Sequence, residues 1–273
     1  MFSMRGYDFV CCEWCDLAMY RGAEQVESSE ALLPLRYPDY VTDAPVRRRQ
    51  ARQALRWLSR AGVEASRGPH LLDVGCAAGF FMSEAARPEY GWKPQGCDVN
   101  GDVVSYARYA LGLDVLRSEF LDAPFAAGSF DVITMLSVLQ HLPRPRQVEQ
   151  RAYALLRPGG VIAIETWNRR SLAARGMGSH WHVYAPPSCL WYHSHRSLSV
   201  LFSSDRWKPL RYVAAPKWIS VRHATSAMKS AAPRLASVAR RTFRVTQASR
   251  TALPYVAGDH VLAIFQRDER AAA

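Results

Sequence analysis

The sequence predicts an α/β fold whose mostly parallel sheet is covered by helices on both faces. Between residues 70 and 166, segments typical of strands alternate with segments typical of helices, which is the order that builds a parallel sheet. The clearest pair starts with the apolar run 70–74, turns through small residues and continues as an expected helix over residues 80–86. Such a turn forms a ligand cradle, because small residues allow close approach and the N–H groups of the helix start point at the ligand.

Periodicity and turn residues predict the other elements. Helices are expected over residues 45–60, 101–111, 143–157 and from Ser194 to about residue 203, and strands over residues 94–99, 113–116, 129–134, 161–165, 209–214 and 259–266. The last two strands are expected to pair in antiparallel fashion.

The turn after the first strand has the pattern D-x-G-x-A-x-G, running from Asp73 to Gly79. Dinucleotide-binding turns have the pattern G-x-G-x-x-G. Counting from Gly75, this chain has Ala77 and Phe80 at the other two glycine positions. The spacing therefore disfavours a nicotinamide-dependent dehydrogenase.

Three further segments follow in the order found in one large family. Asp98 ends the second strand, 25 positions after Asp73; the strand 129–134 follows, and an R-P-G-G turn leads into the strand that ends at Glu165. Together with the first turn, these segments resemble the class I S-adenosylmethionine (SAM) dependent methyltransferases. The resemblance is to the methyltransferase domain 23 and ubiquinone-biosynthesis O-methyltransferase-like group, and it covers roughly residues 45–267.

The resemblance implies a Rossmann-like, doubly wound sheet of seven strands, mostly parallel with an antiparallel edge strand, and SAM as the cofactor. Asp73 would help to place the amino-acid end of SAM, and Asp98 would accept hydrogen bonds from both ribose hydroxyls. Glu119 and Phe120 match the pair that lies against adenine, with core packing as the alternative for Phe120. The implied cofactor residues are Asp73, Gly75, Cys76, Ala77, Gly79, Asp98, Val99, Glu119, Phe120, Leu136 and Ser137.

The segment after the fourth strand, residues 135–141, bears on the chemistry. The ubiquinone-pathway enzymes that it resembles carry E-x-x-E-H here and hold a divalent metal with it, whereas this chain has Ser137, Gln140 and His141. A single strong ligand does not suit Mg²⁺, so metal-independent chemistry is expected. His141 is the leading candidate for a general base, with a structural role as the alternative, and His180 and His182 are further candidates.

The expected function is transfer of a methyl group from SAM to oxygen or carbon of a small-molecule acceptor, such as a secondary metabolite, a quinone-like compound or a sugar. One alternative is a methyltransferase that acts on RNA or another anionic macromolecule. Against it, the Asn/Asp-Pro-Pro-aromatic motif of base-amine methylating relatives is replaced here by residues 134–137, Thr-Met-Leu-Ser. Another alternative is a non-catalytic SAM-binding or membrane-surface module. The oligomeric state is left open.

The chain is expected to divide into three parts: an N-terminal extension over residues 1–43, a methyltransferase domain over residues 44–267, and a disordered tail over residues 268–273. Within the domain, residues 167–195 are a connection on the substrate side, and residues 215–252 are a basic helical insert. The extension carries Cys12 and Cys15, which form one C-x-x-C. This pair resembles half of the zinc ribbon of some relatives, and half a site holds zinc poorly.

Composition places the chain among globular proteins of one domain with additions, or at most two domains. It has 273 residues, of which 49% are hydrophobic, and contains no run of 18 apolar residues, so no transmembrane segment is expected. The N-terminal residues do not form the apolar core of a signal peptide. The 6 cysteines do not resemble the disulfide framework of a secreted protein. A cytoplasmic location is the expectation.

Positive charge is concentrated in one stretch of the chain. The net charge is +11, and residues 206–258 contain Lys or Arg at 11 positions and no Asp or Glu. This stretch is interpreted either as a solvated basic face or as a surface for an anionic partner or a membrane.

Overall fold

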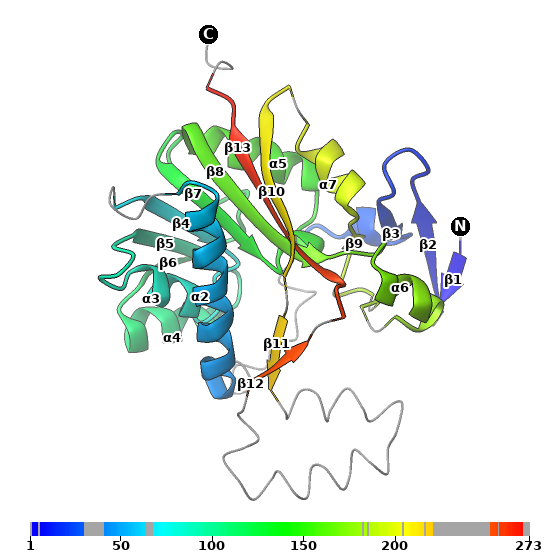
Figure 1. Ribbon diagram of the computed structural model, residues 1–273, viewed down its shortest axis with the longest axis horizontal. Helices are drawn as coiled ribbons and strands as arrows, with labels where there is room; N and C mark the ends of the chain where they lie inside the picture. The colour runs from blue at the N-terminus through cyan, green and yellow to red at the C-terminus, as the bar shows by residue number, and fades with distance from the viewer. Residues whose placement is uncertain are drawn as a thin grey trace, which may run out of the picture.

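The computed structural model describes residues 2–4, 6–29, 41–63, 68–181, 183–184, 186–203, 205–215, 217–220, 252–255 and 257–269. Its centre is a seven-stranded sheet with the order β10-β13-β8-β7-β4-β5-β6 (Figure 1). The strands are β4 (His70–Val74), β5 (Lys93–Asp98), β6 (Asp114–Arg117), β7 (Phe130–Leu136), β8 (Leu156–Trp167), β10 (Trp207–Ala214) and β13 (His260–Arg267).

The sheet is mostly parallel, as predicted. Strands β6, β5, β4, β7 and β8 pair in parallel, whereas β13 is antiparallel to β8 and to β10. The antiparallel pair at this side of the sheet confirms the expectation for residues 209–214 and 259–266. The reversed strand itself, β13, lies one place inside the edge strand β10. The parallel strands place their carboxyl ends along one edge, which is where ligands bind in such sheets.

Helices cover both faces of the sheet. They are α2 (Ala44–Arg60), α3 (Phe80–Ala85), α4 (Gly101–Leu111), α5 (Pro145–Leu155) and α7 (His195–Leu201). A short helix, α6 (Leu172–Met177), lies away from this sheet, and its Ala174 packs with Phe9 and Trp181 (Figure 1). Consecutive strand residues show the alternation: Leu71 packs with Leu55 of α2 and Phe81 of α3, whereas Leu72 packs with Val148 of α5 and Leu198 of α7. Among the described helices, none has the length and apolar character needed to cross a membrane.

Local signals set the helix boundaries. Asn100 caps α4 by accepting from two backbone N–H groups, and Ser194 forms a capping box with Ser197 at the start of α7. The helix predicted over residues 143–157 is shorter, because α5 ends at Leu155 and β8 begins at Leu156.

The N-terminal extension and the substrate-side connection share one small sheet. Strands β1 (Phe2–Met4), β2 (Tyr7–Cys11), β3 (Ala18–Tyr20) and β9 (Trp191–Tyr192) lie in the order β1-β2-β3-β9, beside the main sheet in Figure 1. Phe9 of β2 packs against the rings of Tyr184 and Tyr192, and Trp181 is fully buried in the same cluster. The aromatic residues of the connection therefore form a core.

The insert predicted to be helical over residues 215–252 begins and ends as strands instead. β11 (Lys217–Ser220) and β12 (Ala252–Tyr255) pair in antiparallel fashion. Trp218 fixes this ribbon to α2, because its indole N–H donates to Gln53 (2.8 Å), its carbonyl accepts from Gln50 (2.9 Å), and Arg49 stacks on its ring. The rest of the insert, residues 221–251, lies outside the described residues.

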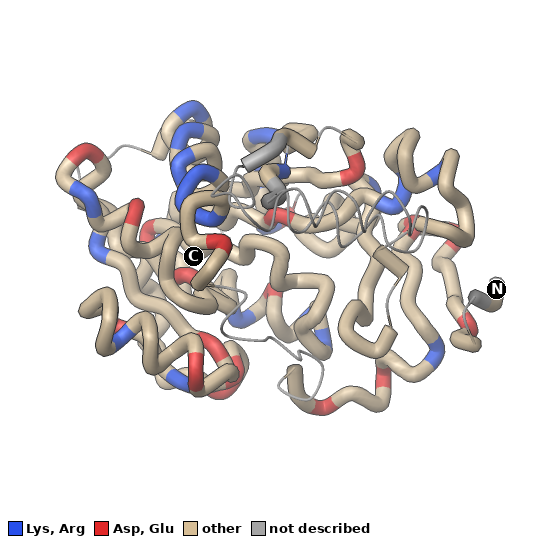
Figure 2. Tube along the Cα trace, turned by 90° about the horizontal axis from the view of Figure 1, so that it is seen from below, with Lys and Arg blue, Asp and Glu red and all other residues tan. Residues whose placement is uncertain are grey.

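Positive charge in the described part of the chain gathers on α2. The helix carries six arginines, and Figure 2 shows Lys and Arg side by side along its turns. Three arginines surround the buried carboxylate of Glu84: Arg48 (2.9 Å), Arg52 (3.1 Å) and Arg87 (3.5 Å). Arg48 and Arg52 hold the pKa of Glu84 below its ordinary value against the opposing effect of burial. This cluster therefore joins α2 to α3.

Candidate active site

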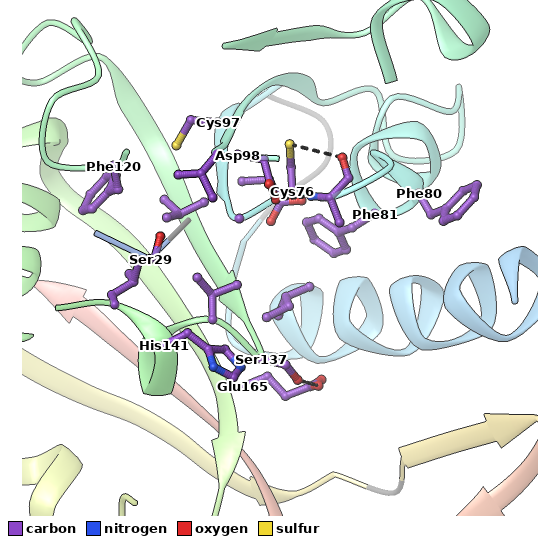
Figure 3. A pocket seen from close by; sticks show the side chains of 18 of the residues that line it. Ser29, Cys76, Phe80, Phe81, Cys97, Asp98, Phe120, Ser137, His141 and Glu165 are labelled. Carbon is purple, nitrogen blue, oxygen red and sulfur yellow. Dashed lines mark hydrogen bonds between the residues drawn. The ribbon is translucent and has the colours of Figure 1, made fainter. Parts of the chain in front are cut away.

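A cleft opens at the carboxyl ends of β4, β5, β7 and β8 and encloses about 1200 Å³ of empty space, including its mouth. Figure 3 shows side chains from these strands and from α2 and α3 around it. Its lining combines carboxylates and other polar groups with apolar side chains. They are Ser29, Arg47, Gln50, Ala51, Asp73, Val74, Gly75, Cys76, Ala77, Phe80, Phe81, Cys97, Asp98, Val99, Ser118, Glu119, Phe120, Leu136, Ser137, Val138, His141, Leu142, Glu165 and Lys217.

The turn after β4 is tied to the end of β5. The N–H groups of Gly75 and Cys76 donate to the carbonyl of Cys97 (2.8 and 3.2 Å), and the N–H of Ala77 donates to Oδ2 of Asp98 (2.9 Å). Gly75 has a φ of +64°, and a Cβ there would lie 2.6 Å from Cγ2 of Val138. Glycine is therefore required for close packing as well as for conformation.

Two buried carboxylates lie beside this turn. Oδ1 of Asp98 accepts from the N–H of Asn100 (2.9 Å); burial raises the pKa of Asp98, and its backbone donors oppose that rise. Asp73 accepts from the hydroxyl of Thr134 (2.7 Å), and burial raises the pKa of Asp73 to about 7. The Asp98 carboxylate adds to that rise, so the two acids disfavour each other's ionisation in the absence of a cation.

Glu119 closes the other side of the cleft together with the N-terminal extension. Oε1 accepts from the hydroxyl of Ser28 (2.7 Å) and from the N–H of Ser29 (2.7 Å), and the hydroxyl of Ser29 also reaches Oε2 (2.9 Å). Phe120 is 2% exposed and belongs to the main core, although its ring also lines the cleft. Both roles foreseen for Phe120 are therefore compatible with its position.

The structure brings together nearly all of the predicted cofactor residues. Asp73, Gly75, Cys76, Ala77, Asp98, Val99, Glu119, Phe120, Leu136 and Ser137 line the cleft. Gly79 is not among the lining residues. It is the N-cap residue before α3 with a φ of +74°, and a Cβ there would lie 2.4 Å from Cδ1 of Leu113, so glycine is required here for backbone conformation and packing.

The three histidine candidates have different positions. His141 lines the cleft, and its Nδ1 is bonded to the carbonyl of Ser188, so this nitrogen carries the proton. Nε2 then accepts from the amide of Gln140 (3.1 Å), whose own oxygen accepts from the hydroxyl of Thr166 (3.0 Å). Burial lowers the pKa of His141. Both ring nitrogens are thus engaged by the protein, which favours the structural role over the general base.

The other two histidines are not found at the cleft. His180 is exposed in the short 3₁₀ turn Gly178–His180 and does not line it. His182 lies outside the described residues.

Three polar residues of the cleft were not among the predicted site residues: Arg47, Glu165 and Lys217. The position of Glu165 at the end of a parallel strand was a usable signal, because those ends converge on the ligand. Arg47 and Lys217 belong to no recognisable motif. They reach the cleft only because α2 and β11 pack over it.

Comparison with known proteins places the chain in a family. Residues 46–204 match the model of a family described as a methyltransferase domain, which is more than half of the chain. The chain therefore belongs to this family of class I SAM-dependent methyltransferases, whose cofactor is SAM.

Curated relatives agree with the family over part of their length. The ubiquinone biosynthesis O-methyltransferase of Nitrosococcus oceani is 40% identical over 108 residues, which are 37% of this chain and 45% of that protein. The protein of the same name from Cronobacter sakazakii is 34% identical over 110 residues, which are 38% and 44% of the two chains. The chain thus spans less than half the length of these relatives in the matched region.

Solved structures share the fold at low identity. The [4+2]-cyclase SpnF has a TM-score of 0.55 and 16% identity, with 80% of this chain and 81% of that chain covered. Geranyl diphosphate C-methyltransferase from Streptomyces coelicolor A3(2), solved with Mg²⁺, geranyl diphosphate and S-adenosylhomocysteine, has a TM-score of 0.51 and 18% identity, with 78% and 77% covered. These similarities establish the fold alone.

The cleft has the chemistry that SAM requires. Asp73, Asp98 and Glu119 are three carboxylates in one cleft, and SAM carries a sulfonium, an ammonium and two ribose hydroxyls. The raised pKa of Asp73, caused first by burial, is what a site for a cationic ligand shows when considered without that ligand. The residues present therefore fit the cofactor.

In the described part of the chain, no group of three or more His, Cys, Asp or Glu side chains is arranged to hold a metal ion. Cys12 and Cys15 remain close, since a hydrogen bond between their side chains contributes to lowering the pKa of Cys12, after the backbone N–H of Cys15. The expectations of a half zinc ribbon and of metal-independent chemistry stay predictions.

Proposed function

We propose that this chain transfers a methyl group from SAM to a hydroxyl oxygen of a small-molecule acceptor. The observation that carries the proposal is the composition of one cleft. Carboxylates that suit SAM lie at the ends of β4 and β5, and a second polar group, around Glu165, lies at the end of β8. The relatives are named as O-methyltransferases, which supports oxygen as the acceptor atom.

Bound SAM supplies a methyl group on a sulfonium, which is already a strong electrophile. The chain's own residues bind the cofactor, orient the acceptor toward it and exclude water. In this proposal Asp98 accepts from the ribose hydroxyls, Asp73 accepts from the amino-acid end of SAM, and Glu119 accepts from the adenine amine. Leu136 and Phe81 supply apolar wall on the same cleft, which keeps water from the reacting atoms.

We propose that no divalent metal takes part, on the chemistry of the donor set. Ser137 donates its hydroxyl to Glu165 (3.1 Å), and the side-chain oxygen of Gln140 accepts from Thr166 (3.0 Å). A hydroxyl and an already bonded amide replace the two glutamates expected in a metal-binding version of this segment. Mg²⁺ prefers carboxylates, so these positions suit an organic acceptor better than a cation.

The proposed domain organisation follows the same geometry. Residues 44–267 form the methyltransferase domain, and the extension 1–43 completes it, because β3 pairs with β9 of the substrate-side connection and Ser29 lines the cleft. Deleting the extension is therefore expected to affect the cleft itself.

Transfer from SAM labelled in its methyl group tests the proposal. The purified protein would be incubated with a panel of catechols, phenols, quinols and sugars, with Asp98→Ala as the control that lacks the ribose ligand. A labelled product with wild type and not with Asp98→Ala supports the proposal. The fold is shared with a cyclase, so cofactor binding without transfer to any acceptor would contradict it.

The alternatives rest on the basic stretch 206–258, of which residues 221–251 lie outside the described residues. A macromolecular acceptor or a membrane-surface module predicts binding to RNA or to anionic vesicles that weakens steeply with salt. A small-molecule enzyme predicts transfer that does not depend on either.

A further inference from the structure

Two oppositely charged side chains line the end of the cleft opposite the glycine turn. Glu165 lies near the end of β8, and Lys217 lies at the start of β11, 52 residues later; both line the cleft. In Figure 3, Glu165 lies beside Ser137 and His141, on the other side of the cleft from Asp98 and Cys97. This position separates Glu165 from the residues that suit the ribose.

One oxygen of Glu165 is held by the protein, and the other is not. Oε1 accepts from the hydroxyl of Ser137 (3.1 Å) and lies 3.4 Å from Nδ1 of His260. Oε2 has no hydrogen-bond partner among the described residues, and the side chain is 17% exposed. The carboxylate is thus oriented by one oxygen and open to a ligand at the other.

Lys217 is delivered by the ribbon β11–β12. Its ammonium lies over the ring of Trp167, 4.3 Å from the centroid. The neighbouring Trp218 fixes the strand to α2 through Gln53 and Arg49. In the described part of the chain no salt bridge joins Lys217 to Glu165, and the two groups act on each other by charge attraction over a longer distance.

The electrostatics suit proton transfer. Burial raises the pKa of Glu165, and the charges of Lys217 and Arg47 oppose that rise. Burial lowers the pKa of Lys217 to about 8. The charge of Glu165 opposes this lowering, and the charge of Arg47 adds to it. His260, facing Glu165 from β13, is neutral because burial lowers its pKa well below the ordinary value. A carboxylate with a raised pKa accepts a proton from a hydroxyl more readily than an unperturbed carboxylate does.

The order of the strands distinguishes this end of the cleft from the cofactor end. Glu165 is three strands from Asp98, in the order β5-β4-β7-β8, or about 14 Å at the usual strand spacing. The sulfonium of SAM is only one carbon from the ribose. With the ribose at Asp98, Glu165 therefore lies beyond the sulfonium, where an acceptor must approach.

We propose that Glu165 and Lys217 are the proton-accepting and oxyanion-stabilising residues for the acceptor hydroxyl. The proposal rests on the methyl transfer argued above and names the groups that serve it. An oxygen lone pair of the acceptor forms the new C–O bond as the C–S bond breaks and its electron pair stays on sulfur. The hydroxyl proton moves to Oε2 of Glu165, and the ammonium of Lys217 stabilises the oxygen as it loses that proton.

The competing role is cofactor binding, since an acid and a lysine also suit the amino-acid end of SAM. Calorimetric titration with SAM separates the two roles without any acceptor. Glu165→Gln and Lys217→Met are expected to bind SAM within about 2-fold of wild type, as are the exposed controls Glu89→Gln and Lys208→Met. A loss of more than about 10-fold in either cleft variant would assign that residue to the cofactor and overturn the proposal.

Chemical labelling gives a second readout. Lys217 is expected to react with acetic anhydride at pH 8 faster than the exposed Lys208, in the protein saturated with S-adenosylhomocysteine, because its amine is partly neutral there. Peptide mass spectrometry measures both rates in one sample. Complete protection of Lys217 by S-adenosylhomocysteine would contradict its place at the acceptor end.

Kinetics with an acceptor found in the panel completes the test. Glu165→Gln is expected to lower kcat by about 100-fold or more, as for loss of a general base, with KM for SAM unchanged. Its pH profile should also lose the limb at which rate rises with pH, and Glu165→Asp should recover part of kcat. An unchanged kcat in Glu165→Gln would contradict only the role of Glu165 as proton acceptor. A wild-type protein that transfers no methyl group would contradict the proposed function itself.

Discussion

Ser29 donates both its backbone N–H and its hydroxyl to the carboxylate of Glu119, which lies 90 residues further along the chain. The contact places the N-terminal extension at the wall of the cleft, where an acid is expected to meet the adenine amine. The extension therefore forms part of the cleft wall, and it binds the acid that is predicted to meet the cofactor.

Replacing Glu119 by Ala should release this part of the extension. The N–H of Ser29 loses a charged acceptor, so tryptic cleavage after the exposed Arg21 is expected to become several-fold faster. Ser3→Ala, which removes a hydroxyl from the outer hairpin, serves as the control and should leave the rate unchanged. Equal rates in wild type and Glu119→Ala would show that the contact does not hold the extension.

Asp73 should make both stability and SAM binding depend on pH. Burial raises its pKa to about 7 from 3.8, so the folded state binds more protons than the unfolded state between these values. The ligand-free protein should therefore lose stability as pH rises through this window and level off above it. Asp73→Asn should remove that part of the slope in thermal unfolding experiments.

Binding of SAM should release a proton from Asp73. The cationic ligand favours the carboxylate, so SAM affinity is expected to rise with pH up to about 7. Calorimetry in two buffers of different ionisation enthalpy measures the proton release. The same release in Asp73→Asn would assign it to another group.

Asp98 should contribute both to the stability of the turn after β4 and to the affinity for SAM. Asp98→Ala removes the acceptor of two backbone N–H groups, those of Ala77 and Asn100. SAM binding is expected to weaken by about 1–3 kcal/mol, as for a lost charge-assisted hydrogen bond. Asp98→Asn keeps one oxygen acceptor and should lose less thermal stability than Asp98→Ala. Wild-type SAM affinity in Asp98→Ala would contradict the ribose assignment.

Gly75 offers a steric test with a matched control. A Cβ at Gly75 would lie 2.6 Å from Cγ2 of Val138, whereas at Gly112, which has nearly the same φ, it would meet nothing within 4 Å. Gly112→Ala should lower the free energy of unfolding by about 1 kcal/mol because of backbone conformation alone, and Gly75→Ala should lower it by about 1–3 kcal/mol more. Adding Val138→Ala should recover part of the difference in denaturant unfolding. Equal losses at the two glycines would show that the turn has room.

The cofactor side of the site was accessible from sequence because it depends on local pattern. Asp73, Gly75 and Asp98 are fixed by a strand, a tight turn and a second strand tip, and each has a recognisable spacing. The order of the elements gave the sheet for the same reason. The role of Gly79 at the ligand stays a prediction, because the motif does not distinguish a glycine that meets SAM from one that packs on Leu113.

The acceptor side could not be derived in this way. Lys217 reaches the cleft through the docking of Trp218 on α2, a contact between segments far apart in the sequence. His141 has the right residue type and position for a base, but its bonds to Ser188 and Gln140 depend on tertiary structure. Side-chain partners of this kind are invisible to spacing, so the sequence alone could neither reveal the bonds of His141 nor bring Lys217 to the cleft.

Calorimetric titration of the purified protein with SAM and with S-adenosylhomocysteine, with NADH as control, tests the central claim most directly. The account predicts micromolar binding of both ligands and none of NADH. Absence of binding to either ligand would contradict it, because the cleft at the ends of β4 and β5 would then not be a SAM site.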